Sequence, residues 1–134
     1  MVGGDDVGET MEKYKISGTV VHGKALGRTV GMPTINLETK EDISRIPSGV
    51  YASKARLREK EYLGVTSVGK RPTVDEDDYR TIETYLLNFS EDVYGEEVEL
   101  TLEAYIREIQ KFDSIKQVKE QVKKDIKATY TFLE

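Results

Sequence analysis

Residues 97–106 read E-V-E-L-T-L-E-A-Y-I, and this stretch decides the fold class. Apolar side chains recur there at every second position, which is the period of a β-strand with one buried face. We expect that face to consist of Val98, Leu100, Leu102, Ala104 and Ile106. The stretch therefore predicts a strand that covers a hydrophobic core and carries mostly polar side chains on its other face.

Four other segments have a similar β-type composition and are separated by clusters of Gly, Pro and Asp. They cover residues 14–22, 49–58, 61–68 and 81–89. No helical pattern interrupts this series, which favours an antiparallel barrel or sandwich over a parallel α/β sheet.

The end of the chain changes to the period of an α-helix. Its apolar side chains are spaced by three or four residues: Ile115, Val118, Val122, Ile126 and Tyr130. Ser114 and Gln117 have the spacing of a capping box, in which each side chain bonds the backbone N–H of the other residue. Five lysines lie on the remaining faces. Such a face can bind nucleic acid, although a charged face on a terminal helix is usually just solvated.

Composition excludes several classes of function. The 134 residues suffice for one domain, and the formal net charge of -5 argues against a nucleic-acid partner. The chain has no Cys and one His, which excludes thiol nucleophiles, thiolate zinc sites and two-histidine metal sites. No apolar run approaches the ~18 residues that cross a bilayer, so we expect no membrane partner.

The first residues differ in composition from the rest of the chain. Residues 1–13 are rich in Gly and in acidic side chains, and we interpret them as a flexible leader in front of one domain, 14–134. This leader lacks the pattern of a signal peptide, and the absence of Cys fits a reducing compartment. We therefore expect a cytoplasmic protein, and we expect it to be a monomer.

A Gly-rich segment carries the densest functional signals. Residues 18–36 read G-T-V-V-H-G-K-A-L-G-R-T-V-G-M-P-T-I-N. Glycines let backbone N–H groups approach a phosphate chain, and a nearby cation neutralises it. Thr34 and Asn36 point the same way in an extended segment, and their oxygens suit a metal that arrives with nucleotide phosphates. The alternative is structural: a turn at residues 33–34 and an Asx-type cap at Asn36.

Glu83 is the candidate general base. In segment 81–89 it shares a face with Tyr85, Leu87 and Phe89. Desolvation among such side chains raises the pKa of a carboxyl group and makes it a better proton acceptor near neutral pH. The alternative is a carboxylate at the barrel rim that reaches water or pairs with an Arg.

Arg107 and Phe112 flank the loop that leads to the helix. An Arg and an aromatic ring in this arrangement can clamp a planar ligand by stacking. Phe112 can also pack the helix against the barrel, as the residue just outside its N-terminus. Both roles are compatible.

Six motifs, in this order along the chain, resemble the riboflavin kinase (flavokinase) family. The first three are G-x-V-x-H-G from residue 18, G-R-x-x-G-x-P-T-x-N from 27 and P-x-G-V-Y from 47. Then follow G-V-x-x-V-G-x-R-P-T from 64 and E-T-Y-L-L-x-F from 83. The series ends with Tyr94-Gly95, Arg107 and K-F-D-S at 111–114. The resemblance covers about residues 14–125.

The resemblance implies a six-stranded antiparallel Greek-key β-barrel with a C-terminal α-helix. It also implies ATP-dependent phosphorylation of riboflavin at the ribityl 5′-hydroxyl, which gives FMN and ADP. The cofactor that it implies is Mg²⁺, and the partners are riboflavin or FMN and ATP or ADP. The alternative is a barrel that binds flavin or nucleotide without turnover. The chain has no room for an adenylyltransferase domain, so we expect FMN as the product.

The resemblance also implies roles for individual residues. Glu83 is similar to the family's catalytic base, and Thr34 and Asn36 are similar to its metal ligands. The implied nucleotide contacts are Gly23, Arg28, Thr34, Asn36, Leu86, Asn88 and Tyr94. The implied flavin contacts are Arg107, Gln110 and Phe112. By strict alternation Leu86 and Asn88 face away from Glu83, so we expect some of their contacts to use backbone atoms.

This sequence departs from the family pattern at three positions. Ile35 stands where the family usually has a small Ala, and Ser67 replaces a common Asn. Ile109 stands where a Glu is often found, which puts one polar flavin contact in doubt.

Overall fold

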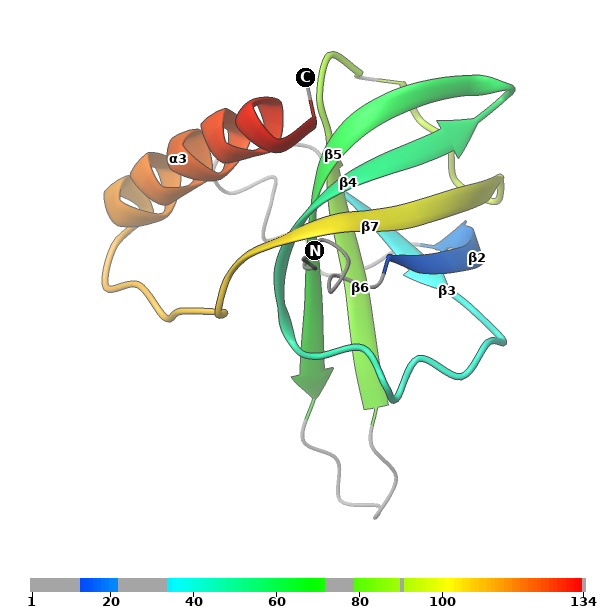
Figure 1. Cartoon of the computed structure of the whole chain (residues 1–134), viewed down its shortest axis with the longest axis horizontal. Helices are drawn as coiled ribbons and strands as arrows, with labels where there is room; N and C mark the ends of the chain where they lie inside the picture. The colour runs from blue at the N-terminus through cyan, green and yellow to red at the C-terminus, as the bar shows by residue number, and fades with distance from the viewer. Residues whose placement is uncertain (1–12, 22–33, 72–78, 90, 134) are drawn as a thin grey trace, which may run out of the picture.

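Six antiparallel strands close into a barrel, with a helix packed against its outside, in the computed structural model (Figure 1). The structure describes residues 13–21, 34–71, 79–89 and 91–133. Within these residues the strands are β2 (Tyr14–Val21), β3 (Ile35–Glu38), β4 (Gly49–Leu57), β5 (Lys60–Arg71), β6 (Tyr79–Leu86) and β7 (Glu97–Arg107), and the helix is α3 (Ile115–Leu133). The predicted mainly β barrel with a C-terminal helix is confirmed.

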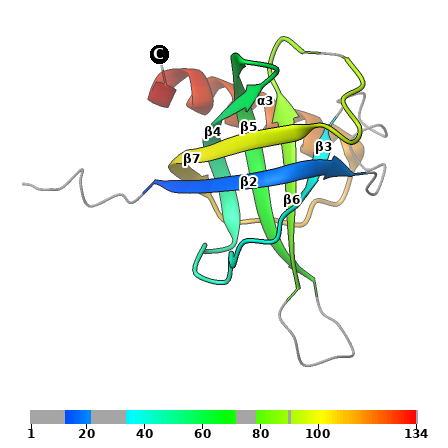
Figure 2. The same ribbon diagram turned by 90° about the vertical axis from the view of Figure 1, so that its right-hand side faces the viewer.

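The strands follow the order β2-β3-β6-β5-β4-β7 around the barrel, and β7 pairs with β2 to close it. Two neighbouring pairs, β3 with β6 and β4 with β7, are distant in sequence, as in a Greek key. Figure 2 shows β2 and β7 crossing in front of β4, β5 and β6. Strand β3 has four residues, which is too short for its alternation alone to identify it as a strand.

Only glycine allows the close approach of β2 to β3. A Cβ atom on Gly18 would lie 2.8 Å from the carbonyl oxygen of Glu38. That separation is shorter than a normal van der Waals contact, so any side chain at this position would push the two strands apart.

One face of each strand fills the barrel interior. Twelve buried apolar residues of the six strands belong to one cluster: Ile16, Val20, Leu37, Tyr51, Ala55, Leu57, Val68, Ile82, Leu86, Val98, Leu100 and Leu102. On β6 the buried residues Ile82, Thr84 and Leu86 alternate with the half-buried Glu83 and Tyr85. Because side chains alternate across a strand, Glu83 lies on the outer face of the barrel.

Three hydroxyl groups form a hydrogen-bonded chain inside the barrel. Ser53, Thr66 and Thr84 are each fully buried. Thr84 Oγ1 lies 2.9 Å from Thr66 Oγ1, and Thr66 Oγ1 lies 2.7 Å from Ser53 Oγ. Ser53 Oγ donates to the Gly64 carbonyl oxygen at 3.0 Å. Each hydroxyl has one proton, so the donors run in one direction from Thr84 to Gly64 and every buried hydroxyl is satisfied.

Strand β7 departs from the predicted alternation after Leu102. Its pairing with β4 shifts twice, so that Leu102 pairs with Ser53, Ala104 with Ala52, and Tyr105 with Tyr51. Each shift places an extra residue in the strand and turns the following side chains to the other face. The prediction that Ala104 shares the face of Val98 is therefore wrong, and Ile106, at the second shift, has no partner on β4. Tyr105 instead packs edge-on against the interior residue Tyr51, with ring centroids 5.3 Å apart.

Helix α3 packs on β4, β5 and β7 from outside the barrel. Ser114 Oγ accepts a hydrogen bond from the Gln117 N–H at 3.2 Å, as the capping box predicts. Gln117 Oε1 accepts from the N–H of Asp113 at 2.8 Å, one residue before the expected donor. The reciprocal half of the predicted capping box is therefore displaced by one residue.

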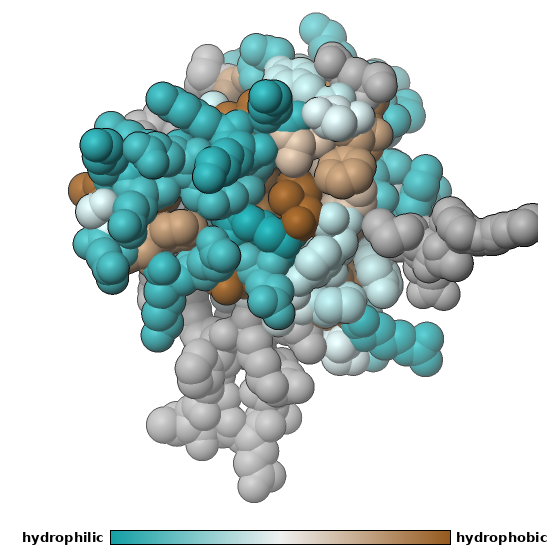
Figure 3. All heavy atoms as spheres, turned by 60° about the vertical axis from the view of Figure 1, so that its left-hand side comes forward, coloured by the Kyte–Doolittle hydropathy of each residue, from teal (hydrophilic) through white to brown (hydrophobic). Residues whose placement is uncertain are grey.

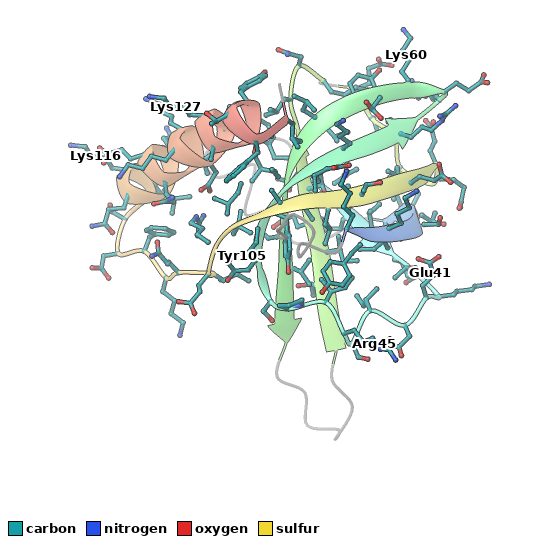
Figure 4. The ribbon with its side chains drawn as sticks, viewed as in Figure 1. Glu41, Arg45, Lys60, Tyr105, Lys116 and Lys127 are labelled. Carbon is teal, nitrogen blue, oxygen red and sulfur yellow. The ribbon has the colours of Figure 1, made fainter. Side chains whose placement is uncertain are left out.

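The predicted apolar stripe of α3 is only partly correct. Ile115 is 49% exposed, whereas the two buried residues of the helix are polar, Asp125 and Thr129. The other side of the helix is mostly hydrophilic (Figure 3), and Lys116 and Lys127 extend from it away from the barrel (Figure 4). Among the described residues, no helix has the length and apolar character needed to cross a membrane.

Candidate functional site

Four neighbouring strands bring the candidate residues into one row across the outer face of the barrel. Val21 on β2 pairs with Asn36 on β3, Asn36 pairs with Glu83 on β6, and Glu83 pairs with Ser67 on β5. Paired residues of antiparallel strands share a face, with Cβ atoms about 4.5–5.5 Å apart. The strand register therefore places the side chains of Asn36, Glu83 and Ser67 beside one another.

Thr34 joins this row through its side chain. Its hydroxyl donates a hydrogen bond to Glu83 Oε2 at 2.7 Å, and both residues are half-buried. A threonine hydroxyl has one proton and two acceptor lone pairs. Because the proton is directed at Glu83, the lone pairs of Thr34 Oγ1 face other directions and can bind a cation.

Glu83 has a different environment from the one the sequence indicated. Strand β6 ends at Leu86, and Asn88 adopts a left-handed backbone conformation with φ of 58°. Phe89 packs against Tyr62 with ring centroids 4.8 Å apart. Tyr85 shares the face of Glu83 as predicted, but the expected continuation of that face to Leu87 and Phe89 is wrong, because the strand ends at Leu86. No ion pair joins Glu83 to Arg45, Arg56, Arg58 or Arg107, the arginines whose side chains the structure describes.

The part of the Gly-rich segment that connects β2 to β3 begins and ends next to this row. The last residue of β2 is Val21 and β3 begins at Ile35, and both strands pair next to Asn36 and Glu83. The predicted phosphate contacts Gly23 and Arg28 lie outside the described residues. Their assignment stays a prediction, supported by the position of the two strand ends that flank the segment.

The three other predicted nucleotide contacts lie in different places. Leu86 is 3% exposed and belongs to the barrel core, so a contact from it would have to use backbone atoms. Asn88 is exposed, and its Nδ2 lies 3.4 Å from the hydroxyl of Tyr130 on α3. Tyr94 is 56% exposed in the turn before Gly95, whose N–H donates to the Val20 carbonyl oxygen at 2.9 Å. This turn therefore lies beside the end of β2, close to the start of the Gly-rich segment.

Of the predicted flavin contacts, Arg107 has partners within the protein. Its Nε donates to Asp125 Oδ1 at 2.8 Å and its Nη2 donates to Asp125 Oδ2 at 2.7 Å. Its Nη1 donates to the carbonyl oxygen of Glu108 at 2.9 Å. The guanidinium also lies 6.0 Å from the ring centroid of Phe112, which is half-buried, whereas Gln110 is exposed.

Sequence reasoning missed Asp125, which is 1% exposed. Its position held a signal, because it lies three residues after Val122 and one before Ile126, within the predicted apolar stripe. A carboxylate at such a position is rarely buried without a partner. Here the partner is Arg107, and Gln121 Nε2 also donates to Asp125 Oδ1 at 3.0 Å.

The loop after β7 returns toward the face that carries Glu83. Ile109, which is 48% exposed, has its Cδ1 atom 3.7 Å from where a Cβ on Gly69 would lie. Gly69 pairs with Thr81 on β6. It lies two residues after Ser67, which pairs with Glu83, so Gly69 and Ser67 are on the same face of β5. Loop 108–114 and Glu83 are therefore on one side of β5 and β6.

The donor set at the row suits a cation that has other ligands of its own. Within the described residues, no group of three or more His, Asp or Glu side chains could hold a metal ion. Thr34 and Asn36 provide hydroxyl and amide oxygens, which are hard donors but too few to enclose Mg²⁺. They fit a cation whose remaining ligands are phosphate oxygens and water.

A model of the Flavokinase family, described as riboflavin kinase, matches residues 10–133. The chain is 42% identical over 111 residues to an RNA-binding riboflavin kinase RibR from Bacillus subtilis. The matched region covers 83% of this chain and 47% of that protein. It is 38% identical over 119 residues to a bifunctional riboflavin kinase/FMN adenylyltransferase from Listeria monocytogenes, and this match covers 89% of this chain and 38% of that protein. The chain thus spans less than half the length of these curated relatives.

Two solved structures are similar in fold. One is described as a macrolide-efflux protein from Streptococcus pneumoniae, with a TM-score of 0.81 and 35% identity over 87% of this chain and 38% of that chain. The other is a riboflavin kinase from Trypanosoma brucei, with a TM-score of 0.69 and 24% identity over 92% of this chain and 82% of that chain. At that identity the second structure shows a shared fold.

Proposed function

The chain belongs to the riboflavin kinase family, and from this premise we propose that residues 14–134 form a domain that phosphorylates riboflavin. The γ-phosphoryl group of ATP is transferred to the ribityl 5′-hydroxyl, and the products are FMN and ADP. The hydrogen bond from Thr34 to Glu83 supports this proposal most directly. It links the candidate base to a candidate phosphate-side ligand, at the place where both ends of the Gly-rich segment are attached.

Glu83 acts as the general base in this proposal. A carboxylate oxygen of Glu83 accepts the proton of the 5′-hydroxyl as the new O–P bond forms, and the bond from the γ-phosphorus to the bridging oxygen breaks to release ADP. Phosphoryl transfer depends mainly on positioning and charge neutralisation, so the base also orients the nucleophile. The hydrogen bond from Thr34 to Oε2 fixes the side chain and leaves Oε1 to face the substrate.

Thr34 Oγ1 and the side-chain oxygen of Asn36 would hold Mg²⁺ that arrives with ATP. The bound ion would neutralise charge on the phosphates. Thr34 also fixes the orientation of Glu83, so loss of its oxygen should affect both groups. Gly23, Arg28, Asn88, Tyr94 and the backbone of Leu86 contact the nucleotide in this proposal.

The flavin side of the site is formed by the loop after β7. We assign Phe112 to stacking on the flavin ring and Gln110 to polar contact. Arg107 faces the same loop, and three of its N–H groups are already directed at Asp125 and Glu108. Its contribution to flavin binding is therefore mainly to support the loop.

Incubation of the protein with riboflavin, ATP and Mg²⁺, followed by chromatography of the flavins, tests the proposed function. We expect FMN to form in proportion to ADP. Recovery of unchanged riboflavin would overturn the kinase proposal. If riboflavin were recovered unchanged but its fluorescence were quenched on binding, the non-catalytic binding barrel would be the better description.

A Thr34→Val variant tests the nucleotide side of the same proposal. Valine keeps the shape of the side chain but removes the oxygen, so FMN formation should fall by at least the ~10–100-fold that loss of a metal-site partner costs. Riboflavin binding, measured by fluorescence quenching, should remain. Normal turnover by Thr34→Val would show that the ligand assignment is wrong.

A further inference from the structure

We propose that Asp125 is a positioning residue for flavin binding: it fixes Arg107 and thereby the loop 108–114 that carries Phe112. This inference rests on the proposed function, because it assigns the flavin ring to that loop. Asp125 lies on α3, on the side of the helix that faces the barrel, and it is not one of the flavin contacts that the family resemblance implies.

The contact between Asp125 and Arg107 fixes the guanidinium in one plane. Both carboxylate oxygens accept from it, at 2.8 and 2.7 Å, and Gln121 Nε2 adds a third hydrogen bond to Oδ1 at 3.0 Å. The side chain of Asp125 is 2% exposed and that of Arg107 is 20% exposed. Two parallel bonds of this kind add directional constraint as well as energy.

Loop 108–114 is held at both ends by side chains that depend on α3. At its start, Arg107 Nη1 donates to the Glu108 carbonyl oxygen at 2.9 Å. At its end, Gln117 Oε1 accepts from the Asp113 N–H at 2.8 Å. Between these points Phe112 lies against the Arg107 guanidinium, and Ile109 lies over Gly69 on the face that carries Glu83.

The side chains that hold the two ends of loop 108–114 indicate which ligand should lose affinity when Asp125 is changed. Without a charged partner, the Arg107 guanidinium would turn toward water, and both the Glu108 bond and the support beneath Phe112 would be lost. On the nucleotide side, Thr34 bonds Glu83 and Asn88 contacts Tyr130, and neither interaction involves Asp125 or this loop. A displacement of about 1 Å can cost ~100-fold when binding depends on fixed geometry. The loss should therefore fall on riboflavin rather than on ATP.

Asp125→Asn in the full chain is the test, because asparagine keeps the shape and removes the charge. We expect the Kd for riboflavin, measured by fluorescence quenching, and the KM for riboflavin to rise about 10–100-fold. The KM for ATP should change by less than about twofold, and Asp125→Glu should restore part of the riboflavin affinity. Arg58→Gln is the matched control, since Arg58 makes a two-point ion pair with Glu96 just beyond the opposite end of β4.

The outcomes separate this inference from the proposed function. If wild-type protein binds riboflavin but makes no FMN, the kinase proposal fails and the binding comparison still tests Asp125. Unchanged riboflavin affinity in a folded Asp125→Asn protein, or equal losses for riboflavin and ATP, would overturn the positioning role. So would a wild-type protein that does not bind riboflavin. If Asp125→Asn does not fold, Gln121→Met removes one donor to Asp125 and must weaken riboflavin binding selectively for the inference to stand.

Discussion

Glu83 and Asp125 are two carboxylates on the outside of the same barrel, and their environments are opposite. Asp125 is 1% exposed and accepts three hydrogen bonds, two from Arg107 and one from Gln121. Glu83 is half-buried and, within the described residues, accepts one hydrogen bond from a neutral hydroxyl. A carboxylate whose two oxygens both accept from a fixed Arg has little capacity left for a substrate, whereas one bonded to a single hydroxyl keeps an oxygen for chemistry.

The difference in environment indicates different roles for the two carboxylates. Asp125 connects α3 to β7 and has no capacity left for a ligand. Glu83 lies in a row with Asn36 and Ser67, beside the attachment points of the Gly-rich segment. Replacement of both partners of a buried ion pair by apolar residues is often neutral for stability, whereas removal of one partner is strongly destabilising. We therefore expect removal of the Asp125 carboxylate to lower stability and removal of the Glu83 carboxylate to lower turnover.

Asp125→Ala should have the largest effect on stability. Removal of one partner leaves the Arg107 charge partly buried without compensation, which typically costs about 3–5 kcal/mol. Denaturant unfolding at neutral pH measures this loss. The double variant Arg107→Leu, Asp125→Leu removes both charges and should be closer to wild type. If Asp125→Ala were as stable as wild type, the ion pair would not hold the helix on the barrel.

Thr66→Val should have an intermediate effect, since it breaks the hydroxyl chain inside the barrel. Thr84 loses its acceptor and Ser53 loses a partner, and both groups remain fully buried. An unsatisfied buried hydroxyl costs about 1–3 kcal/mol, which the same unfolding experiment can resolve. Thr131→Val on the exposed side of α3 removes a hydroxyl that bonds Lys127 and should change little. Equal effects of the two variants would contradict the role of the chain.

Arg58→Gln should have the smallest effect, although it breaks an ion pair with the same two-point geometry. Arg58 contacts Glu96 and Glu91 on the exposed side of the barrel. The hydrogen bond from Arg58 lowers the pKa of Glu96. The pair therefore contributes above the ordinary pKa of a Glu carboxyl, and this contribution is lost as the pH falls through the lowered value. Exposed pairs contribute little, so we expect a melting temperature close to wild type and no change in turnover. A large loss would show that burial does not distinguish the two pairs.

The sequence predicted the parts of the fold that depend on regular alternation. Residues 97–102 show it clearly, and Val98, Leu100 and Leu102 are buried as expected. It failed where pairing with a neighbour decides the conformation. The two register shifts of β7 depend on β4, and the end of β6 depends on the left-handed turn at Asn88. Neither feature has a local period that a sequence pattern can show.

The candidate site was also only partly predictable from the sequence. Thr34, Asn36 and Glu83 were predicted from residue type and family resemblance, and the structure brings them together. The proximity of Glu83 to Thr34 and Asn36 was not predictable from alternation, because it depends on the register between β3 and β6, which are distant in sequence. Asp125 was missed because the helical pattern treats its position as part of an apolar stripe. A charge on that stripe is the feature that could have identified the ion pair.

Glu83→Gln distinguishes a general base from a structural carboxylate, with turnover and melting temperature measured on the same preparation. Glutamine keeps the size of the side chain and can still accept the hydrogen bond from Thr34, but it cannot take a proton. FMN formation per folded molecule should fall by roughly 10²–10⁴-fold, the usual contribution of a general base. Riboflavin affinity and melting temperature should stay close to wild type. Retained turnover together with a lowered melting temperature would show that Glu83 is not the base but a structural carboxylate like Asp125.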